Sequence, residues 1–112
     1  MTSNLRTEIE LRQVYDKVVS FTHTTTSDAA TTVLTVSDYM EEANRISIVV
    51  ETQALYVRFD GSAATDTDPG LSLFMPIAGT YTESDIKITG IISIINAANG
   101  SNGRIRGTIW GR

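Results

Sequence analysis

The stretch Arg45-Ile46-Ser47-Ile48-Val49-Val50-Glu51 decides the fold, because apolar residues recur in it at every second position. Ile46, Ile48 and Val50 share one side of an extended chain, since successive side chains of a strand point to opposite faces. A period of two is typical of a strand that buries one face. The sequence therefore predicts a β-strand here, with its apolar face against a core.

Similar patterns continue along the chain. Residues 55–60 repeat the alternation after Thr52-Gln53, and we expect them to pair with residues 45–51 as a hairpin. Residues 86–95 are mostly β-branched, which disfavours a helix and predicts a central strand that is apolar on both faces. Gly90, in the middle of that run, indicates a bulge or a bend.

The end of the chain carries the strongest turn signal. Residues 99–103 contain two Asn-Gly dipeptides, which favour tight turns. A further alternating run follows at residues 104–110, so we expect the chain to end in a hairpin.

Weaker strand candidates complete the pattern at residues 17–22, 31–36, 71–75 and 80–82. Helical signals are confined to residues 37–42 and the first dozen residues. About seven or eight short strands separated by turn residues are typical of one architecture. The sequence predicts an all-β fold, either an antiparallel β-sandwich or a jelly-roll-like barrel.

The chain has 112 residues, which suits one domain. Residues 1–12 place Leu5, Ile9 and Leu11 among charged residues and hold too few apolar side chains for a core of their own. We expect this segment to be an extended N-terminal arm, either frayed or ordered by a neighbouring molecule, and residues 13–112 to form the β-sandwich domain. The three apolar residues of the arm are candidate interface residues.

Composition excludes several classes of protein. The net charge of −4 argues against a general nucleic-acid binder, because such binding depends on neutralising phosphates with Lys and Arg. The absence of cysteine excludes disulfides and thiolate metal sites. No apolar run approaches the roughly 20 residues that cross a bilayer, and the N-terminus lacks the apolar segment of a secretory signal. We therefore expect neither a membrane nor a nucleic acid as a partner.

The sequence offers little for catalysis. His23 is the single histidine, no Gly-x-Ser-x-Gly motif presents a serine, and no Gly-rich phosphate loop is present. We expect no enzyme activity and no cofactor. Asp60, Asp66 and Asp68 cluster in one segment and are weak candidates for a calcium site, but their spacing does not match an EF-hand loop. A solvated connecting loop is the favoured interpretation of these acids.

Charge is distributed unevenly along the chain. Residues 1–85 carry a net charge of −8, whereas residues 86–112 contain four basic residues and no acid. If Ile105 and Ile109 face inward, then an outer face is formed by Arg104, Arg106, Thr108 and Trp110. Arg and Trp are enriched at energetically important contacts, so these residues predict a docking face for an acidic protein surface. Alternatively, Trp110 only covers the end of the sandwich and the arginines are solvated.

Three motifs carry a resemblance to a known class of protein. They are Tyr56-Val57-Arg58-Phe59-Asp60-Gly61, Pro76-Ile77-Ala78-Gly79-Thr80-Tyr81 and the ending from Ile91 to Trp110. With them, residues 33–110 resemble the small β-sandwich structural proteins of tailed bacteriophages. The resemblance implies a virion component without catalytic residues, made in the host cytoplasm and placed on the capsid exterior. It would cement or decorate neighbouring major capsid subunits, as a dimer or trimer.

Two alternatives remain open. A neck or tail adaptor of the virion belongs to the same class and would have ring symmetry. A calcium- or carbohydrate-binding module belongs to another class, and would combine Asp60, Asp66 and Asp68 with an exposed aromatic such as Tyr56 or Tyr81.

Overall fold

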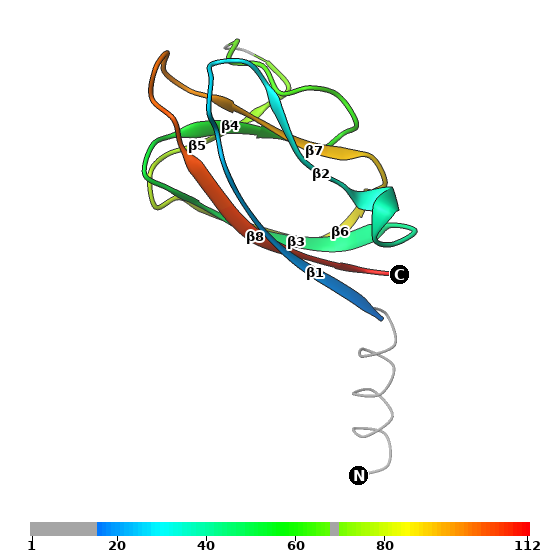
Figure 1. The fold of residues 1–112 in the computed structure, drawn as a ribbon. Coiled ribbons are helices and arrows are strands. Elements are labelled where there is room, and N and C mark those ends of the chain that lie inside the picture. The colour runs from blue at the N-terminus through cyan, green and yellow to red at the C-terminus, as the bar shows by residue number, and fades with distance from the viewer. Residues whose placement is uncertain (1–15, 68–69) are drawn as a thin grey trace, which may run out of the picture.

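The computed structural model describes residues 16–67 and 70–112, and these residues form two antiparallel β-sheets packed face to face (Figure 1). The elements in chain order are β1 (Lys17–Thr24), β2 (Thr31–Thr35), the 3-10 turn η1 (Val36–Asp38), β3 (Ala43–Glu51), β4 (Leu55–Arg58), β5 (Leu73–Met75), β6 (Thr80–Ile88), β7 (Ile91–Asn96) and β8 (Arg104–Gly111). Sheet A has the strand order β1-β8-β3-β6, and sheet B has the order β2-β7-β4-β5.

The topology is that of a jelly roll. Consecutive strands lie in opposite sheets, except for β4 and β5, which are neighbours in sheet B. Every pairing is antiparallel, and β1 pairs with β8, so the beginning and the end of the described chain lie side by side. The predicted fold class, an antiparallel sandwich or jelly-roll-like barrel of about seven or eight strands, is confirmed.

The predicted hairpin of residues 45–51 with 55–60 is wrong. β3 lies in sheet A between β8 and β6, whereas β4 lies in sheet B between β7 and β5. Thr52 has a positive φ of 72°, and Gln53 N–H donates to the Glu51 carbonyl at 2.9 Å, so the chain turns out of sheet A here. The two strands therefore face each other across the core.

The single central strand predicted for residues 86–95 is also wrong, because the chain changes sheets within it. β6 ends at Ile88 in sheet A, and β7 starts at Ile91 in sheet B. The predicted bend at Gly90 is correct. A Cβ at Gly90 would lie 3.0 Å from the Cα of Gly61, so the close approach of the two backbones favours glycine.

The predicted C-terminal hairpin is wrong for a similar reason. β7 lies in sheet B and β8 in sheet A, so the segment with the Asn-Gly dipeptides joins the two sheets. Gly100 has the positive φ of 76° that such dipeptides favour. The predicted turn is therefore correct, although the strands on either side of it do not pair with each other.

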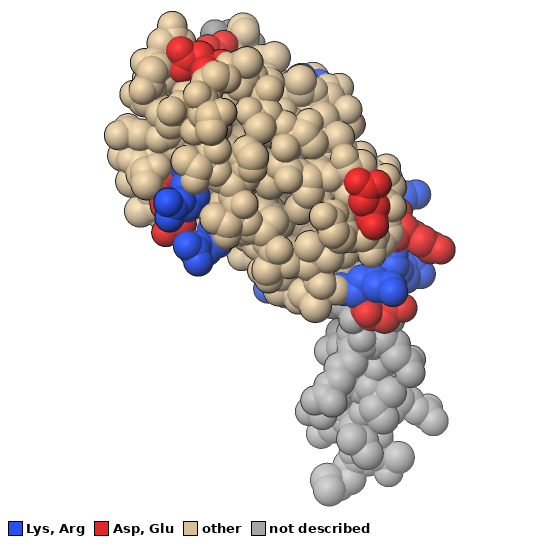
Figure 2. Space-filling model, in the orientation of Figure 1, with Lys and Arg blue, Asp and Glu red and all other residues tan. Residues whose placement is uncertain are grey.

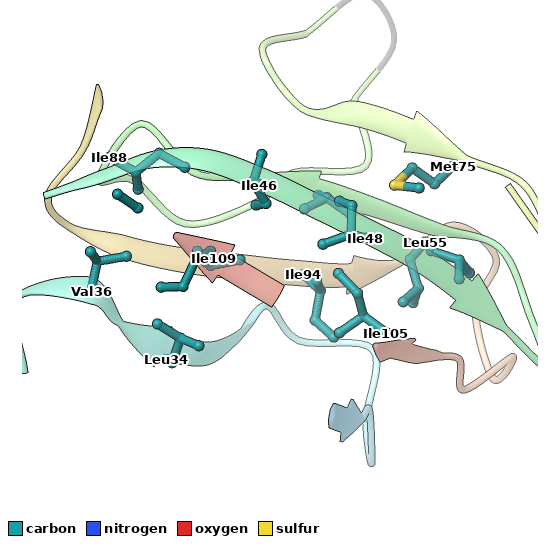
Figure 3. Close-up of a cluster of buried hydrophobic side chains, with 14 of the residues drawn as sticks. Leu34, Val36, Ile46, Ile48, Leu55, Met75, Ile88, Ile94, Ile105 and Ile109 are labelled. Atoms are coloured by element: carbon teal, nitrogen blue, oxygen red, sulfur yellow. The ribbon is translucent and has the colours of Figure 1, made fainter. Parts of the chain in front are cut away.

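The core between the sheets is aliphatic (Figure 3). Ile46, Ile48 and Val50 of β3 are at most 2% exposed, as the alternation predicts. Further buried residues come from both sheets: Leu34, Leu55, Val57, Met75, Ile88, Ile92, Ile94, Ile105 and Ile109. Aliphatic side chains thus fill the space between the sheets.

Two sequence expectations fall outside this description. The arm of residues 1–12, with Leu5, Ile9 and Leu11, lies outside the described residues, and so does the boundary proposed at residue 13. Among the residues that are described, no helix has the length and hydropathy needed to span a bilayer.

Candidate functional site

The outer face of sheet A brings together the four residues that the sequence singled out on the last strand. Ile105 and Ile109 are fully buried, so the alternation of β8 turns the other set of side chains outward. That set is Arg104, Arg106, Thr108 and Trp110. Its placement follows from the strand, while its role as an interface stays a prediction.

Arg45 is a fifth member of this face, and the sequence interpretation missed it. Arg45 of β3 is the register partner of Trp110 on β8, and its guanidinium carbon lies 5.1 Å from the centroid of the indole ring. This distance is typical of a cation–π contact. Arg45 belongs to the stretch that decides the fold, but pairing with a residue so distant in sequence is not visible from alternation alone.

One hydrogen-bond donor of the Arg45 guanidinium is unused within the described part of the chain. Its Nε is buried and has no hydrogen-bond partner among the described residues. None of the ion pairs within the described part of the chain involves Arg45. Trp110 supplies no hydrogen-bond acceptor for the guanidinium, and because Nε is buried, a carboxylate from outside would have to bind the Nη atoms of Arg45.

A row of hydroxyl groups crosses sheet A beside this pair. One member comes from each strand, in the order Ser20, Thr108, Ser47 and Thr82. The Ser20 and Thr108 hydroxyl oxygens lie 3.2 Å apart, and those of Ser47 and Thr82 lie 3.0 Å apart. Ser20, Ser47 and Thr108 of this row line, together with Arg106, a shallow hollow of about 420 Å³.

Intramolecular partners neutralise part of the positive charge of the C-terminal segment. Arg106 pairs with Glu51 at 3.1 Å, and Arg112 pairs with Glu42 at 3.0 Å. Arg104 donates to the Thr24 hydroxyl at 3.2 Å and has no ion pair within the described residues. In the view of Figure 2, charged side chains gather toward the ends of the molecule and leave an uncharged region between them.

The acidic residues proposed for calcium do not form a site in the described part of the chain. The Asp60 carboxylate accepts two hydrogen bonds from Arg58, at 2.7 and 3.0 Å, and a third from Ser62 N–H at 3.1 Å. The bond from Arg58 is the main cause that lowers the pKa of Asp60. Asp66 is exposed, and Asp68 lies outside the described residues. No three His, Cys, Asp or Glu residues come together among those described.

The two aromatic candidates for a carbohydrate site lie apart from each other. Tyr81 packs against the core with its ring 6.1 Å from that of Phe59, and burial is the main cause that raises its pKa. Tyr56 lies on the outer face of sheet B, where its ring meets Phe74 edge-on at 5.4 Å. The two tyrosines therefore do not belong to one surface.

Comparison with known proteins identifies the fold alone. No family model and no curated protein matches the sequence. A cupin superfamily protein from Desulfitobacterium hafniense superposes with a TM-score of 0.51 and 8% identity, over 87% of this chain and 70% of that one. A capsid structure of the Helicobacter pylori bacteriophage KHP30 gives a TM-score of 0.51 and 13% identity, over 87% of this chain and 90% of that one. The likeness supports a cupin-type, jelly-roll architecture.

A third neighbour raises the question of a metal centre. HppE, solved with Fe(II), superposes with a TM-score of 0.51 and 8% identity, over 83% of this chain but only 43% of that one. Protein ligands for such iron are imidazoles and carboxylates. Here the space between the sheets is filled by aliphatic side chains, and His23 is the only histidine of the chain. The described residues between the two sheets therefore do not fit an iron centre.

Proposed function

We propose that this protein is a non-enzymatic docking module that binds the outer surface of a phage capsid through the outer face of sheet A. The observation that carries the proposal is the pair of Arg45 and Trp110, 5.1 Å apart, with Arg45 lacking an ion-pair partner among the described residues. A pre-positioned guanidinium on an aromatic ring is a typical anchor for an acidic protein surface.

The residues around Arg45 and Trp110 favour a docking role over catalysis. Four hydrogen-bonded antiparallel strands lie under the face, with one shift of register between Ala43 and Arg45, and this ordered backbone lowers the entropic cost of fixing the face in a complex. The hydroxyl row offers neutral donors and acceptors beside the charged groups. The closely packed aliphatic interior supplies contacts that stabilise the scaffold and carries no reacting group.

Two likenesses support a phage capsid as the partner. Residues 33–110 resemble phage structural proteins in sequence, and the KHP30 capsid chain shares the fold over 90% of its own length. In this role the module decorates or cements neighbouring major capsid subunits. A neck or tail adaptor remains the alternative within the same class, and would bind isolated necks or tails instead of shells.

The test compares binding of two arginine variants to empty capsid shells of the phage that encodes the chain. Arg45→Gln removes the charge over Trp110 and is expected to weaken binding by about tenfold or more. Arg58→Gln is the matched control, because Arg58 pairs with Asp60 and lies on the outer face of sheet B, on the opposite side of the sandwich. We expect the control to bind like the wild type in a co-sedimentation assay.

Two results would contradict the proposal. One is a wild-type protein that does not sediment with shells, and the other is equal affinity of Arg45→Gln and the wild type. Thermal unfolding of each variant shows whether weaker binding results from a lost contact or from loss of the folded structure.

A further inference from the structure

The loop between β7 and β8 contains two asparagines that are each followed by glycine, in Asn99-Gly100 and Asn102-Gly103. Such a pair can react with itself in water, because the backbone nitrogen of the glycine attacks the side-chain amide of the asparagine. Glycine favours this attack, since it has no side chain to hinder the approach and its backbone is free to rotate. The two pairs lie in one loop, so a large difference between their rates would come from the folded structure.

Hydrogen bonds hold both reacting groups of the second pair. Asn102 Oδ1 accepts from the Asn96 side chain at 2.9 Å, and Gly103 N–H donates to the Thr25 hydroxyl at 3.0 Å. Gly103 is buried, and its carbonyl oxygen accepts from Thr25 N–H at 2.9 Å. A Cβ at Gly103 would lie 2.5 Å from the Gln53 carbonyl oxygen, so the backbone is closely surrounded here. The nitrogen and the amide of this pair therefore cannot meet unless the buried network opens.

The first pair is open to water. Asn99 and Gly100 are both exposed. Ser101 N–H donates to the Ala98 carbonyl oxygen at 3.1 Å, so the pair occupies the two central positions of a β-turn. The hydrogen bonds that tie this loop to the β1–β2 connection do not involve the Asn99 side chain. The Asn99 amide can therefore rotate toward the Gly100 nitrogen without disturbing the buried network.

Asp28 restrains the reacting nitrogen of the first pair. Gly100 N–H donates to Asp28 Oδ1 at 2.7 Å, in a contact that is exposed to solvent. The nitrogen must give up this proton as it attacks, and a hydrogen bond from the proton to a negative carboxylate favours the form that keeps it. We therefore expect Asp28 to make the reaction of Asn99 slower than in an unfolded chain. A single exposed hydrogen bond breaks far more readily than the buried network around Asn102, so the reaction is slowed but not prevented.

We propose that Asn99 is a site of spontaneous deamidation and that the fold protects Asn102. The Gly100 nitrogen bonds to Cγ of Asn99, the bond from Cγ to the amide nitrogen breaks, and this nitrogen leaves as ammonia with the proton of Gly100. Water then opens the cyclic imide at one of its two carbonyl groups, which gives aspartate or isoaspartate. The reaction consumes water alone and needs no partner. Each event replaces a neutral amide by a carboxylate and changes the net charge from −4 to −5.

The test follows the purified full chain in neutral buffer over several weeks by mass spectrometry. Trypsin cleaves after Lys87 and Arg104, so one peptide, residues 88–104, carries both pairs, and its fragments locate each converted asparagine. We expect Asn99 to convert at least about tenfold faster than Asn102, because the second pair must break buried hydrogen bonds before it reacts. The matched control is the synthetic peptide of residues 88–104, in which both asparagines should convert at similar rates and faster than Asn99 of the folded chain.

Two variants separate the contributions of the residues. Asn99→Gln should stop the conversion, because the longer side chain closes a larger ring that forms more slowly. Asp28→Ala removes the acceptor of Gly100 N–H and should speed up Asn99 severalfold, while Asn102 of the same molecules stays slow. Equal acceleration of both asparagines would mean that the loop has opened, and would contradict the role of Asp28. The proposal is overturned if Asn99 and Asn102 convert equally fast in the folded wild type, or if Asn99 stays intact while the peptide converts.

Discussion

At the scale of single residues, Asn96 shows how a polar side chain holds two loops together. Its side chain is at the end of β7 and is 2% exposed. Its amide nitrogen donates to Ser27 O, Asp28 Oδ1 and Asn102 Oδ1 at 3.1, 3.0 and 2.9 Å. Its oxygen accepts from the Thr25 hydroxyl at 2.5 Å. The β1–β2 and β7–β8 connections are thereby tied to each other by a satisfied buried network.

Asp28 makes this network sensitive to acid. The N–H of Gly100, 2.7 Å away, is the main cause that lowers the pKa of Asp28, and the Asn96 amide adds to it. A carboxyl whose folded pKa lies below its unfolded value of 3.8 stabilises the fold above that pH and loses the contribution as the pH falls through the folded pKa. We expect the free energy of unfolding to fall below pH 3.8 less steeply in Asp28→Asn than in the wild type. Urea unfolding across that range measures this.

Asp60 also contributes to the loss of folding free energy in acid, and a variant of Asp60 provides the control. The pKa of Asp60 is lowered by its hydrogen bonds from Arg58, so the same sign applies to it. The double variant with Asp28→Asn and Asp60→Asn should be flatter in acid than either single variant. An acid slope unchanged by Asp28→Asn would contradict the role assigned to the network.

Among the residues of the candidate site, the sequence predicts the direction of some side chains but misses others. Alternation correctly placed Thr108 and Trp110 on one face of β8, because the direction of a side chain in a strand is a local property. Arg45 was missed because its position beside Trp110 depends on the register between strands far apart in the chain. Likewise, four separate strands bring the hydroxyl row together, and no local pattern reports such a row.

At the scale of strands, the alternation predicted where the chain is extended but not which strands pair, and it merged the end of β6 with β7 into one strand. Residues 45–51 and 55–60 each bury one face, and this holds equally for neighbours in one sheet and for strands that face each other across the core. Which of these two arrangements forms depends on the residues that connect the strands, such as Thr52, with its positive φ of 72°, and Gly90. The sequence therefore predicted the fold class while assigning both hairpins wrongly.

Gly107 gives the clearest test of packing within β8. A Cβ at this position would lie 2.6 Å from Ile48 Cγ2, 2.7 Å from the Ser47 carbonyl oxygen and 2.8 Å from Phe21 Cζ. Two of these atoms belong to the packed interior and one to the backbone, so little can move aside. We expect Gly107→Ala to lower the free energy of unfolding by about 2 kcal/mol, as overpacking does.

Thr108→Ala is the control for that experiment, because Thr108 is the next residue of β8 and points outward. Its effect should stay within about 0.5 kcal/mol, which is usual for surface changes. Urea unfolding compares the two variants with the wild type. A Gly107→Ala protein as stable as the wild type would show that the neighbouring strands can separate at this point.

At the scale of the whole molecule, the two outer faces differ in chemistry. Sheet A presents arginines and hydroxyl groups, which suit an acidic partner, whereas the outer face of sheet B carries the aromatic pair of Tyr56 and Phe74. The net charge of −4 makes the positive character of the first face local, so attraction to an acidic surface must act at short range.

Local attraction of this kind has a measurable salt dependence. Replacing Arg104 and Arg106 with Glu changes the net charge from −4 to −8 and reverses the sign of one end of the face. The fold should persist, because the Arg106 side chain is 56% exposed and such exposed ion pairs contribute little to stability. Binding to capsid shells should weaken, and the binding that remains should no longer decrease as the salt concentration rises.

The matched control for that experiment is Ala63→Glu, which adds negative charge in the exposed loop after β4, on the side of sheet B. Titration at several ionic strengths distinguishes a local contact from a general effect of net charge, because screening acts over about 10 Å at 0.1 M salt. A general effect would weaken both proteins in proportion to their charge. Equal salt dependence of the wild type and the double variant would mean that β8 does not face the partner, and the docking surface would then have to lie elsewhere on the sandwich.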